Sequence, residues 1–221
     1  MSAESGLKTF RDSGGLWEGY DVMDVASIDG WHRNPAQVLE FYNLRRKQAY
    51  HAEPNAGHLA LVELEKHFNV WIVTQNVDSL HEKAGSTQIV HLHGELSKVR
   101  SIADETAVTD IADGSIQLGD TGADGAQLRP HIVWFGEMVP EIERAAALVQ
   151  HADIVIVIGT SLVVYPAAGL VGLAPEGTPI YLIDPSRPDI HFTDNITFLE
   201  KTAALGTPEL ISELIKQYST V

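Results

Sequence analysis

The sequence contains no cysteine, so disulfide bonds, thiolate nucleophiles and cysteine-ligated zinc sites are excluded. It also lacks a long apolar run. The longest, IVIVIG at residues 154–159, is far shorter than the roughly 20 residues that cross a bilayer as a helix. The amino-terminal residues show no apolar stretch typical of a signal peptide. We therefore expect a soluble, cytoplasmic protein.

Basic residues are scarce, because 15 Lys and Arg stand against 30 Asp and Glu, and the formal net charge is −15. A surface of this sign repels nucleic acids and anionic membranes, so neither is an expected partner. The chain has 221 residues, 44% of them hydrophobic. This is enough to build one large domain, or one domain that carries an inserted module.

Short β-branched runs alternate with amphipathic stretches along most of the chain, which favours an α/β fold with a mainly parallel sheet. Continuous apolar runs predict strands covered on both faces, at 69–74, 88–92, 131–134, 153–158, 179–183 and 196–199. Helices are expected between them, at 35–51, 56–67, 141–151, 165–173 and 208–218. Pro35 and Pro208 would occupy helix starts, where proline is tolerated.

Two regions interrupt this alternation. Residues 23–56 predict helix without strand. Residues 101–129 are rich in Gly, Asp, Ala and Thr, which indicates a surface insertion with a small hairpin around Ile116 and Leu118.

A polar cluster follows the strand predicted at 69–74. In open α/β sheets ligands bind beyond the carboxyl ends of strands, where Gln75, Asn76 and Asp78 would lie. Their amides and carboxylate supply donors and acceptors for a carboxamide and for ribose hydroxyls. The alternative, which the spacing alone favours, is an N-cap at Asn76 or Asp78 for a helix over 79–84.

Two further motifs carry candidate chemistry. His91 and His93 would share one face of a strand, and His93, followed by Gly94, is a candidate general base at a strand end. The alternatives are a structural histidine or a metal pair, although no third ligand is near in sequence. The Gly159-Thr160-Ser161 turn offers N–H and hydroxyl groups to a phosphate or ribose, but such turns are common.

Taken in order, SAESGLKTFRD, TQNVDSLHEKAG, HLHGEL, PHIVWFGE and GTSLVVYPAA resemble the sirtuins, which are NAD-dependent protein deacylases. The similarity is greatest to the bacterial class III, sirtuin-5-like branch. It implies a Rossmann-like NAD-binding domain, with helices on both faces of its sheet, formed by residues 1–22, 57–100 and 130–221. It also implies a small inserted module formed by 23–56 and 101–129. NAD would be the cofactor, and acyl-lysine proteins or peptides would be the partners.

The same resemblance implies roles for single residues. His93 matches the catalytic base and Asn76 is a second catalytic residue, in a reaction that releases nicotinamide and O-acyl-ADP-ribose. The cofactor would contact Ser2, Ala3, Glu4, Phe10, Arg11, Gln75, Asn76, Asp78, Gly159, Thr160, Ser161, Leu182, Asp184 and Ala203. The substrate peptide would add as a strand to Val133, Phe135, Gly136, Val163 and Val164. The alternative for these apolar residues is packing in the core.

The segment FYNLRR at 41–46 bears on the acyl group. Tyr42 and Arg45 would share a helix face and resemble the Tyr-x-x-Arg pair of sirtuins that accept succinyl or malonyl groups. A guanidinium can bind a carboxylate through two hydrogen bonds while the phenol adds a third. The alternative is a solvated helix face, extended by Arg46 and Lys47. We expect desuccinylation and demalonylation, with slower deacetylation.

The chain departs from the sirtuin pattern in three places. The four zinc-binding cysteines are missing and residues 101–129 take their place, so no zinc is expected and the site residues include no metal ligand. Leu182 stands where relatives carry an Asn beside the adenosine ribose, next to Asp184. The family's first strand and Gly-Ala-Gly turn would precede Ser2, so we expect an open apolar slot in the sheet, weakened NAD binding and a native start upstream of Met1.

Two other functions remain open at this point. One is a non-catalytic module that binds NAD or ADP-ribose, which would not need the base His93. The other is an ADP-ribosyltransferase, against which Tyr42 and Arg45 favour an acyl-lysine substrate. A dehydrogenase is disfavoured because no Gly-x-Gly-x-x-Gly follows a first strand.

Overall fold

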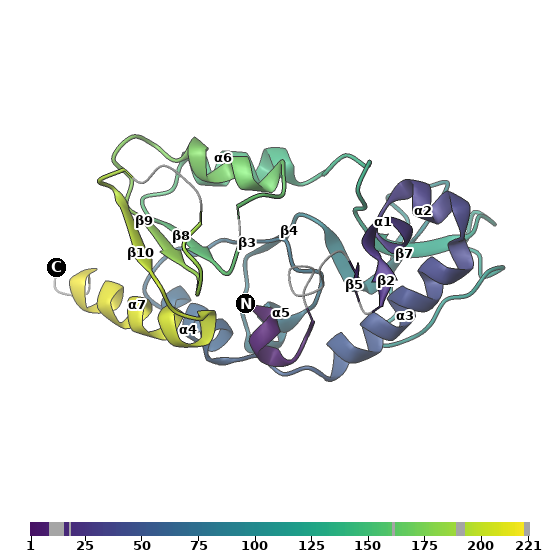
Figure 1. Ribbon diagram of the computed structural model, residues 1–221, viewed down its shortest axis with the longest axis horizontal. Coiled ribbons are helices and arrows are strands. Elements are labelled where there is room, and N and C mark those ends of the chain that lie inside the picture. The colour runs from purple at the N-terminus through teal and green to yellow at the C-terminus, as the bar shows by residue number, and fades with distance from the viewer. Residues whose placement is uncertain (9–15, 18, 161, 189–192, 219–221) are drawn as a thin grey trace.

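The computed structural model describes residues 1–8, 16–17, 19–160, 162–188 and 193–218. The molecule is elongated, with helices α1–α3 and strands β5 and β7 at one end and strands β8–β10 with helix α7 at the other (Figure 1). Strands β3 and β4 lie between the two ends. No described helix is long and apolar enough to cross a membrane.

The small module combines helices with an antiparallel sheet. Its helices are α1 (Val22–Val25), α2 (Ile28–Arg33) and α3 (Pro35–His51), beside the short pair β1 (Leu16–Trp17) and β2 (Tyr20–Asp21). Its sheet has the order β6-β5-β7, with β5 at Gly94–Ser101, β6 at Val108–Asp110 and β7 at Leu128–Ile132. The helix predicted at 35–51 is confirmed, because Asn34 accepts the N–H of Gln37 and Pro35 occupies the first turn.

The hairpin predicted around Ile116 and Leu118 is wrong. The backbone of Ile116 pairs with a side chain instead of a strand, because Asn43 of α3 donates to its carbonyl at 2.8 Å and accepts its N–H at 3.1 Å. Ile116 itself is buried in the module core. That core extends beyond the predicted module boundaries, since Leu80, Leu96 and Ile132 belong to the same buried cluster.

The other half of the molecule is a parallel α/β arrangement in two separate sheets. One pairs β3 (Ile72–Thr74) with β4 (Ile89–His91), and the other has the order β10-β9-β8. The strands of the second are β8 (Val155–Ile158), β9 (Ile180–Ile183) and β10 (Ile196–Leu199). The helices are α4 (Ala56–Glu65), α5 (Leu80–Ala84), α6 (Ile142–Gln150) and α7 (Ala203–Tyr218), with 3₁₀ helices η1 (Ser2–Ser5) and η3 (Ala167–Leu173).

Helix α7 begins earlier than its sequence indicates, and Pro208 lies inside it instead of at its start. A contact between residues near the two ends of the chain stabilises this start. The Glu4 carboxylate accepts the N–H of Ala204 at 3.0 Å, which satisfies a free donor of the first turn. A cap supplied from 200 positions away cannot be read from local sequence.

An apolar slot separates the two parallel sheets, in agreement with the expectation of an open slot. No described strand joins β3 to β8. Ile72, Val73, Ile156 and Val157 line a cavity at this place. Met1 lies at the carboxyl end of the slot, close to Gly159. A Cβ added to Gly159 would come within 2.7 Å of the amino nitrogen of Met1.

Candidate active site

A cavity of about 1800 Å³ extends from the slot along the carboxyl ends of the parallel strands to the small module. It brings together most of the residues predicted for the site. They come from η1, from helix α3, from the ends of β3, β8 and β9, and from the segments after β7 and β8. The lining includes Ser2, Ala3, Glu4, Tyr42, Arg45, Gln75, Asn76, Asp78, His93, Val133, Phe135, Gly136, Gly159, Thr160, Val163, Val164, Asp184 and Ala203. Phe10, Arg11 and Ser161 lie outside the described residues.

Leu182 does not line this cavity. It lies within β9, paired with Val157 and Phe198 on the neighbouring strands, and only 2% of it is exposed. The cavity follows the ends of the strands, and β9 continues to Ile183. Asp184, the first residue after the strand, lines the cavity instead.

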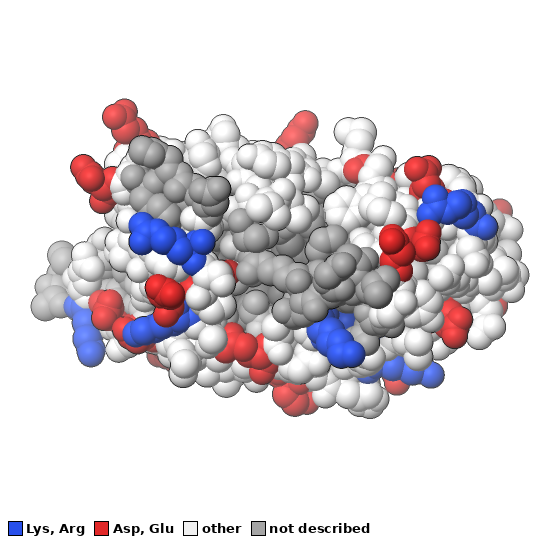
Figure 2. Space-filling view, viewed as in Figure 1, with Lys and Arg blue, Asp and Glu red and all other residues white. Residues whose placement is uncertain are grey.

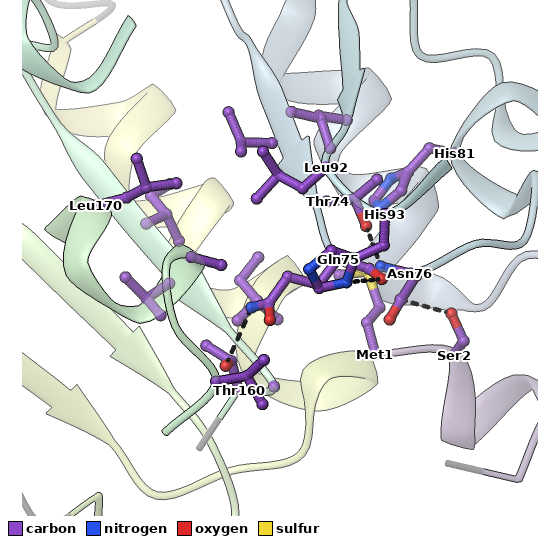
Figure 3. Close-up of a pocket in the computed structure, with 18 of the residues that line it drawn as sticks. Met1, Ser2, Thr74, Gln75, Asn76, His81, Leu92, His93, Thr160 and Leu170 are labelled. Carbon is purple, nitrogen blue, oxygen red and sulfur yellow. Dashed lines mark hydrogen bonds between the residues drawn. The ribbon is translucent and has the colours of Figure 1, made fainter. Parts of the chain in front are cut away.

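The polar cluster after β3 connects three segments (Figure 3). The Asn76 amide donates to the Ser2 hydroxyl at 2.8 Å, and the Gln75 amide donates to the Thr160 hydroxyl at 3.4 Å. The backbone N–H of Asn76 donates to the Thr74 hydroxyl at 3.0 Å, which turns the chain at the end of the strand. The cluster therefore holds η1 and the ends of β3 and β8 around one space.

His93 projects into this space with a defined tautomer. Its Nδ1 lies 3.1 Å from the Gln75 carbonyl oxygen, which can only accept, so Nδ1 carries the proton and Nε2 has the free lone pair. Burial lowers the pKa of His93, although the bond to Gln75 works in the opposite direction. A neutral imidazole with an available Nε2 is suited to act as a general base near neutral pH.

His91 does not share this environment, contrary to the prediction of a common strand face. Strand β4 ends at His91, and its Nε2 lies 2.6 Å from Glu82 of α5. Burial disfavours its charge, but the hydrogen bond and charge of Glu82 leave the pKa of His91 raised. His91, Glu82 and Glu95 place ligand-type atoms within 4.8 Å of one another. The cluster thus brings carboxylates beside His91 that the sequence did not indicate, and in it Glu82 pairs with His91 and Glu95 pairs with Lys98.

Asp78 contacts the start of α5 but does not occupy its N-cap position. Its Oδ1 accepts the N–H of Leu80, the first residue of the helix, at 3.2 Å, whereas the N-cap is Ser79, which makes no side-chain cap bond. Asp78 is buried and also lines the cavity. A carboxylate has two oxygens with several lone pairs, so the bond to Leu80 and a ligand contact are compatible.

The residues present fit a nucleotide bearing a ribose and a carboxamide. Amides, hydroxyls and carboxylates come from the ends of three strands, at Gln75 and Asn76, Thr160, and Asp184. Gly159 has a left-handed φ of 63°, which leaves the chain without a side chain where it turns at the end of β8. This donor and acceptor set can hold NAD.

The predicted acyl-binding pair lies at the module end of the cavity. Tyr42 and Arg45 are only 1% and 6% exposed, so the alternative of a solvated helix face is wrong for them. Burial raises the pKa of Tyr42, which therefore remains a neutral hydroxyl. Arg46, also buried, has a structural role: its guanidinium donates to the carbonyls of Leu96 and Gly114.

The predicted peptide-binding segments border the cavity with exposed apolar side chains, Phe135 at 41% and Val163 at 69%. Core packing is therefore not the role of these two side chains. The backbone of Phe135 is already used, because its N–H donates to Ala26 and its carbonyl accepts from Ile28. A peptide strand would have to pair with backbone groups beside it.

The sequence analysis did not single out Arg129, Trp134 and Glu137 as a unit. The Arg129 guanidinium forms two hydrogen bonds with the Glu137 carboxylate and stacks on the Trp134 ring, and Trp134 donates to the Tyr42 hydroxyl. The motif WFGE contains two of these residues. Their link to Tyr42 spans 92 positions and has no local signal.

Comparison with known proteins places this site in a family. A model described as "Sir2 family" matches residues 1–166. The "NAD-dependent protein deacylase" of Bacteroides thetaiotaomicron is 54% identical over 97% of this chain and 94% of its own. The protein of the same name from Helicobacter pylori strain 26695 is 51% identical over 99% of this chain and 95% of its own. A solved Sir2 homologue in complex with ADP-ribose matches with a TM-score of 0.89 and 36% identity, covering 100% of this chain and 90% of that one. The shared sequence and fold show that this chain belongs to the Sir2 family.

Proposed function

We propose that this chain is an NAD-dependent protein deacylase whose preferred substrates are lysines that carry an acidic acyl group, succinyl or malonyl. Its curated relatives are named NAD-dependent protein deacylases. Related structures hold NAD in one case and an acetylated peptide in another. The acidic acyl preference rests on Tyr42 and Arg45.

The residues of the polar cluster would bind and orient the cofactor. NAD supplies an electrophilic ribose carbon from which nicotinamide departs. Gln75 and Asn76 would offer amide groups to the nicotinamide side of that ribose, and Asp184, directly after β9, lines the same cavity. His93 would accept the proton of a ribose hydroxyl at Nε2, because Nδ1 is directed to Gln75.

The acyl pocket favours a negative charge. Tyr42 and Arg45 lie three residues apart on α3 and both line the cavity. A carboxylate in this buried environment would receive charge-assisted hydrogen bonds from the guanidinium, which are stronger than neutral ones. An acetyl group has no carboxylate and therefore cannot form these charge-assisted hydrogen bonds. The observation that carries the proposal is that His93 and the Tyr42–Arg45 pair line one continuous cavity.

Nicotinamide release from NAD tests this function, measured with matched succinyl-lysine and acetyl-lysine peptides. We expect the higher kcat/KM with the succinyl peptide. Arg45→Met should lower that value by roughly 10- to 100-fold and reverse the preference, because a charge-assisted bond is lost. His93→Ala should lower release with both peptides by about 10²- to 10⁴-fold, the usual contribution of a general base. Equal rates on both peptides in the wild type would contradict the acidic preference.

The open slot between β3 and β8 favours the alternative of a module that binds NAD without turnover. The same assay separates the functions. NAD binding by calorimetry with no nicotinamide release would indicate a binding module. Release without peptide, accompanied by ADP-ribose on protein, would indicate an ADP-ribosyltransferase.

A further inference from the structure

We infer that Trp134 is a specificity-determining positioning residue, which orients the Tyr42 hydroxyl as a hydrogen-bond donor to the acidic acyl group. This inference rests on the proposed function, because it concerns the same pocket. It is carried by one hydrogen bond and by the contacts that hold the indole in place.

The hydrogen bond assigns the direction of the Tyr42 proton. The indole Nε1 lies 2.9 Å from the Tyr42 oxygen, and both residues are almost fully buried. An indole N–H can only donate, so the phenol oxygen is the acceptor here. The phenol proton must therefore point elsewhere, and a buried hydroxyl proton requires an acceptor.

The acyl pocket is the place where such an acceptor is expected. Tyr42, Arg45 and Trp134 all line the cavity. A carboxylate offers only acceptors, so it can take the phenol proton and the guanidinium protons together. Burial keeps the hydroxyl protonated, which preserves its role as a donor.

Two charged residues fix the indole, and we call them the Trp134 clamp. The Arg129 guanidinium lies 3.6 Å from the ring centroid, within the range of a cation–π contact. Glu137 holds Arg129 through bonds of 2.6 and 2.9 Å and accepts the backbone N–H of Trp134 at 2.8 Å. The clamp thus fixes both the ring and the backbone of Trp134.

Packing is the competing role for this residue. The Trp134 ring lies 5.4 Å from the ring of Trp31 and 6.0 Å from that of Tyr42. Phenylalanine would keep an aromatic ring in this cluster but remove the N–H. Trp31→Phe is a matched control, because it makes the same exchange in the same buried cluster at a residue that lies outside the cavity lining.

The test measures kcat and KM for succinyl-lysine and acetyl-lysine peptides with four proteins: wild type, Trp134→Phe, Tyr42→Phe and the double variant. We expect each single variant to raise the succinyl KM about five- to tenfold, the value of one hydrogen bond. The acetyl KM should rise less than the succinyl KM, so that the ratio of the two KM values separates the loss of this hydrogen bond from a general change in the pocket. The double variant should match the single variants, because both remove the same interaction. Trp31→Phe should leave the ratio of the two KM values unchanged.

Several outcomes would overturn the inference: an unchanged succinyl KM in Trp134→Phe, an equal rise for both peptides, or additive losses in the double variant. If Trp134→Phe does not fold, Glu137→Gln loosens the clamp and should raise the succinyl KM alone. A wild type without succinyl preference contradicts the proposed function and the inference with it. A preference that Trp134→Phe retains contradicts the inference alone.

Discussion

Two buried histidines beside the site give the molecule a sensitivity to acid. His58 and His81 pack ring to ring at 4.9 Å, and His58 is fully buried. Burial, with further contributions from His81 and the amino terminus, lowers the pKa of His58 to about 3. The neutral Nδ1 accepts the N–H of Asn55 in the capping box of α4. The folded state therefore requires an uncharged His58.

His58→Gln should make the protein less sensitive to acid. Below pH 6.5, His58 binds a proton in the unfolded chain but not in the folded protein. Stability therefore falls as the pH decreases toward 3. At pH 5 this proton uptake lowers the free energy of unfolding by at most about 2 kcal/mol. That loss corresponds to a fall of roughly 4–8 °C in Tm. Glutamine keeps the capping-box acceptor without the titration. Thermal unfolding at pH 7.5 and 5 should show a smaller fall in Tm for the variant, and parallel falls would contradict this explanation.

At the scale of elements, strands β3 and β8 lie on either side of the apolar slot. Apolar residues of both strands border the slot, and neither strand pairs with the other. β3 runs parallel to β4, and β8 runs parallel to β9. A strand that filled the slot in the same direction would end near Met1, beside Gly159.

Fusing a designed apolar strand of about six residues to the amino group of Met1 should stabilise the protein. Burial of each large apolar side chain contributes about 1.5–3 kcal/mol, and ordering each residue costs about 1–2 kcal/mol. The small net gain should raise Tm by roughly 5–10 °C and tighten NAD binding. A Gly-Ser extension of equal length is the control. Equal Tm values for the two extensions would show that the slot does not accept a strand.

At the scale of the whole molecule, the small module has a core that does not depend on cysteine. Strand β5 pairs with β6 and β7, and the buried cluster includes Val99, Ile116 and Trp134. Arg46 and Arg129 add buried hydrogen bonds to backbone carbonyls. Charged side chains of both signs are interspersed on the face shown in Figure 2, where the basic ones among the described residues form no continuous patch.

We expect the folded protein to contain no structural zinc. Elemental analysis after purification should therefore find less than one zinc per chain, and treatment with a chelator should leave Tm and deacylation unchanged. The reason is that core packing and the hydrogen bonds of buried arginines stabilise the module in place of a metal ion. Stoichiometric zinc, or a fall in Tm on chelation, would contradict this prediction. Glu95→Gln would then show whether the cluster of Glu82, His91 and Glu95 is the site.

Several parts of the fold and site could be predicted because their signals are local. Helix α3 has its cap and its proline in adjacent positions, at Asn34 and Pro35. The apolar runs around Ile72 and Val155 correspond to strands β3 and β8. Strand β5 was missed, because its alternating polar residues do not form an apolar run. The burial of Arg46 was missed for a related reason, since its acceptors lie 50 and 68 positions away.

The sequence by itself determined the absence of cysteine ligands, the α/β character, the order of the sirtuin motifs and the residue types available to the site. The tertiary structure alone decided that His93 donates to Gln75, that Glu4 accepts an N–H of the first turn of α7, that Leu182 lies outside the cavity and that Trp134 donates to Tyr42. The physical reason is separation along the chain. Strand and helix propensities act over a few neighbouring residues, whereas these hydrogen bonds depend on where distant elements pack.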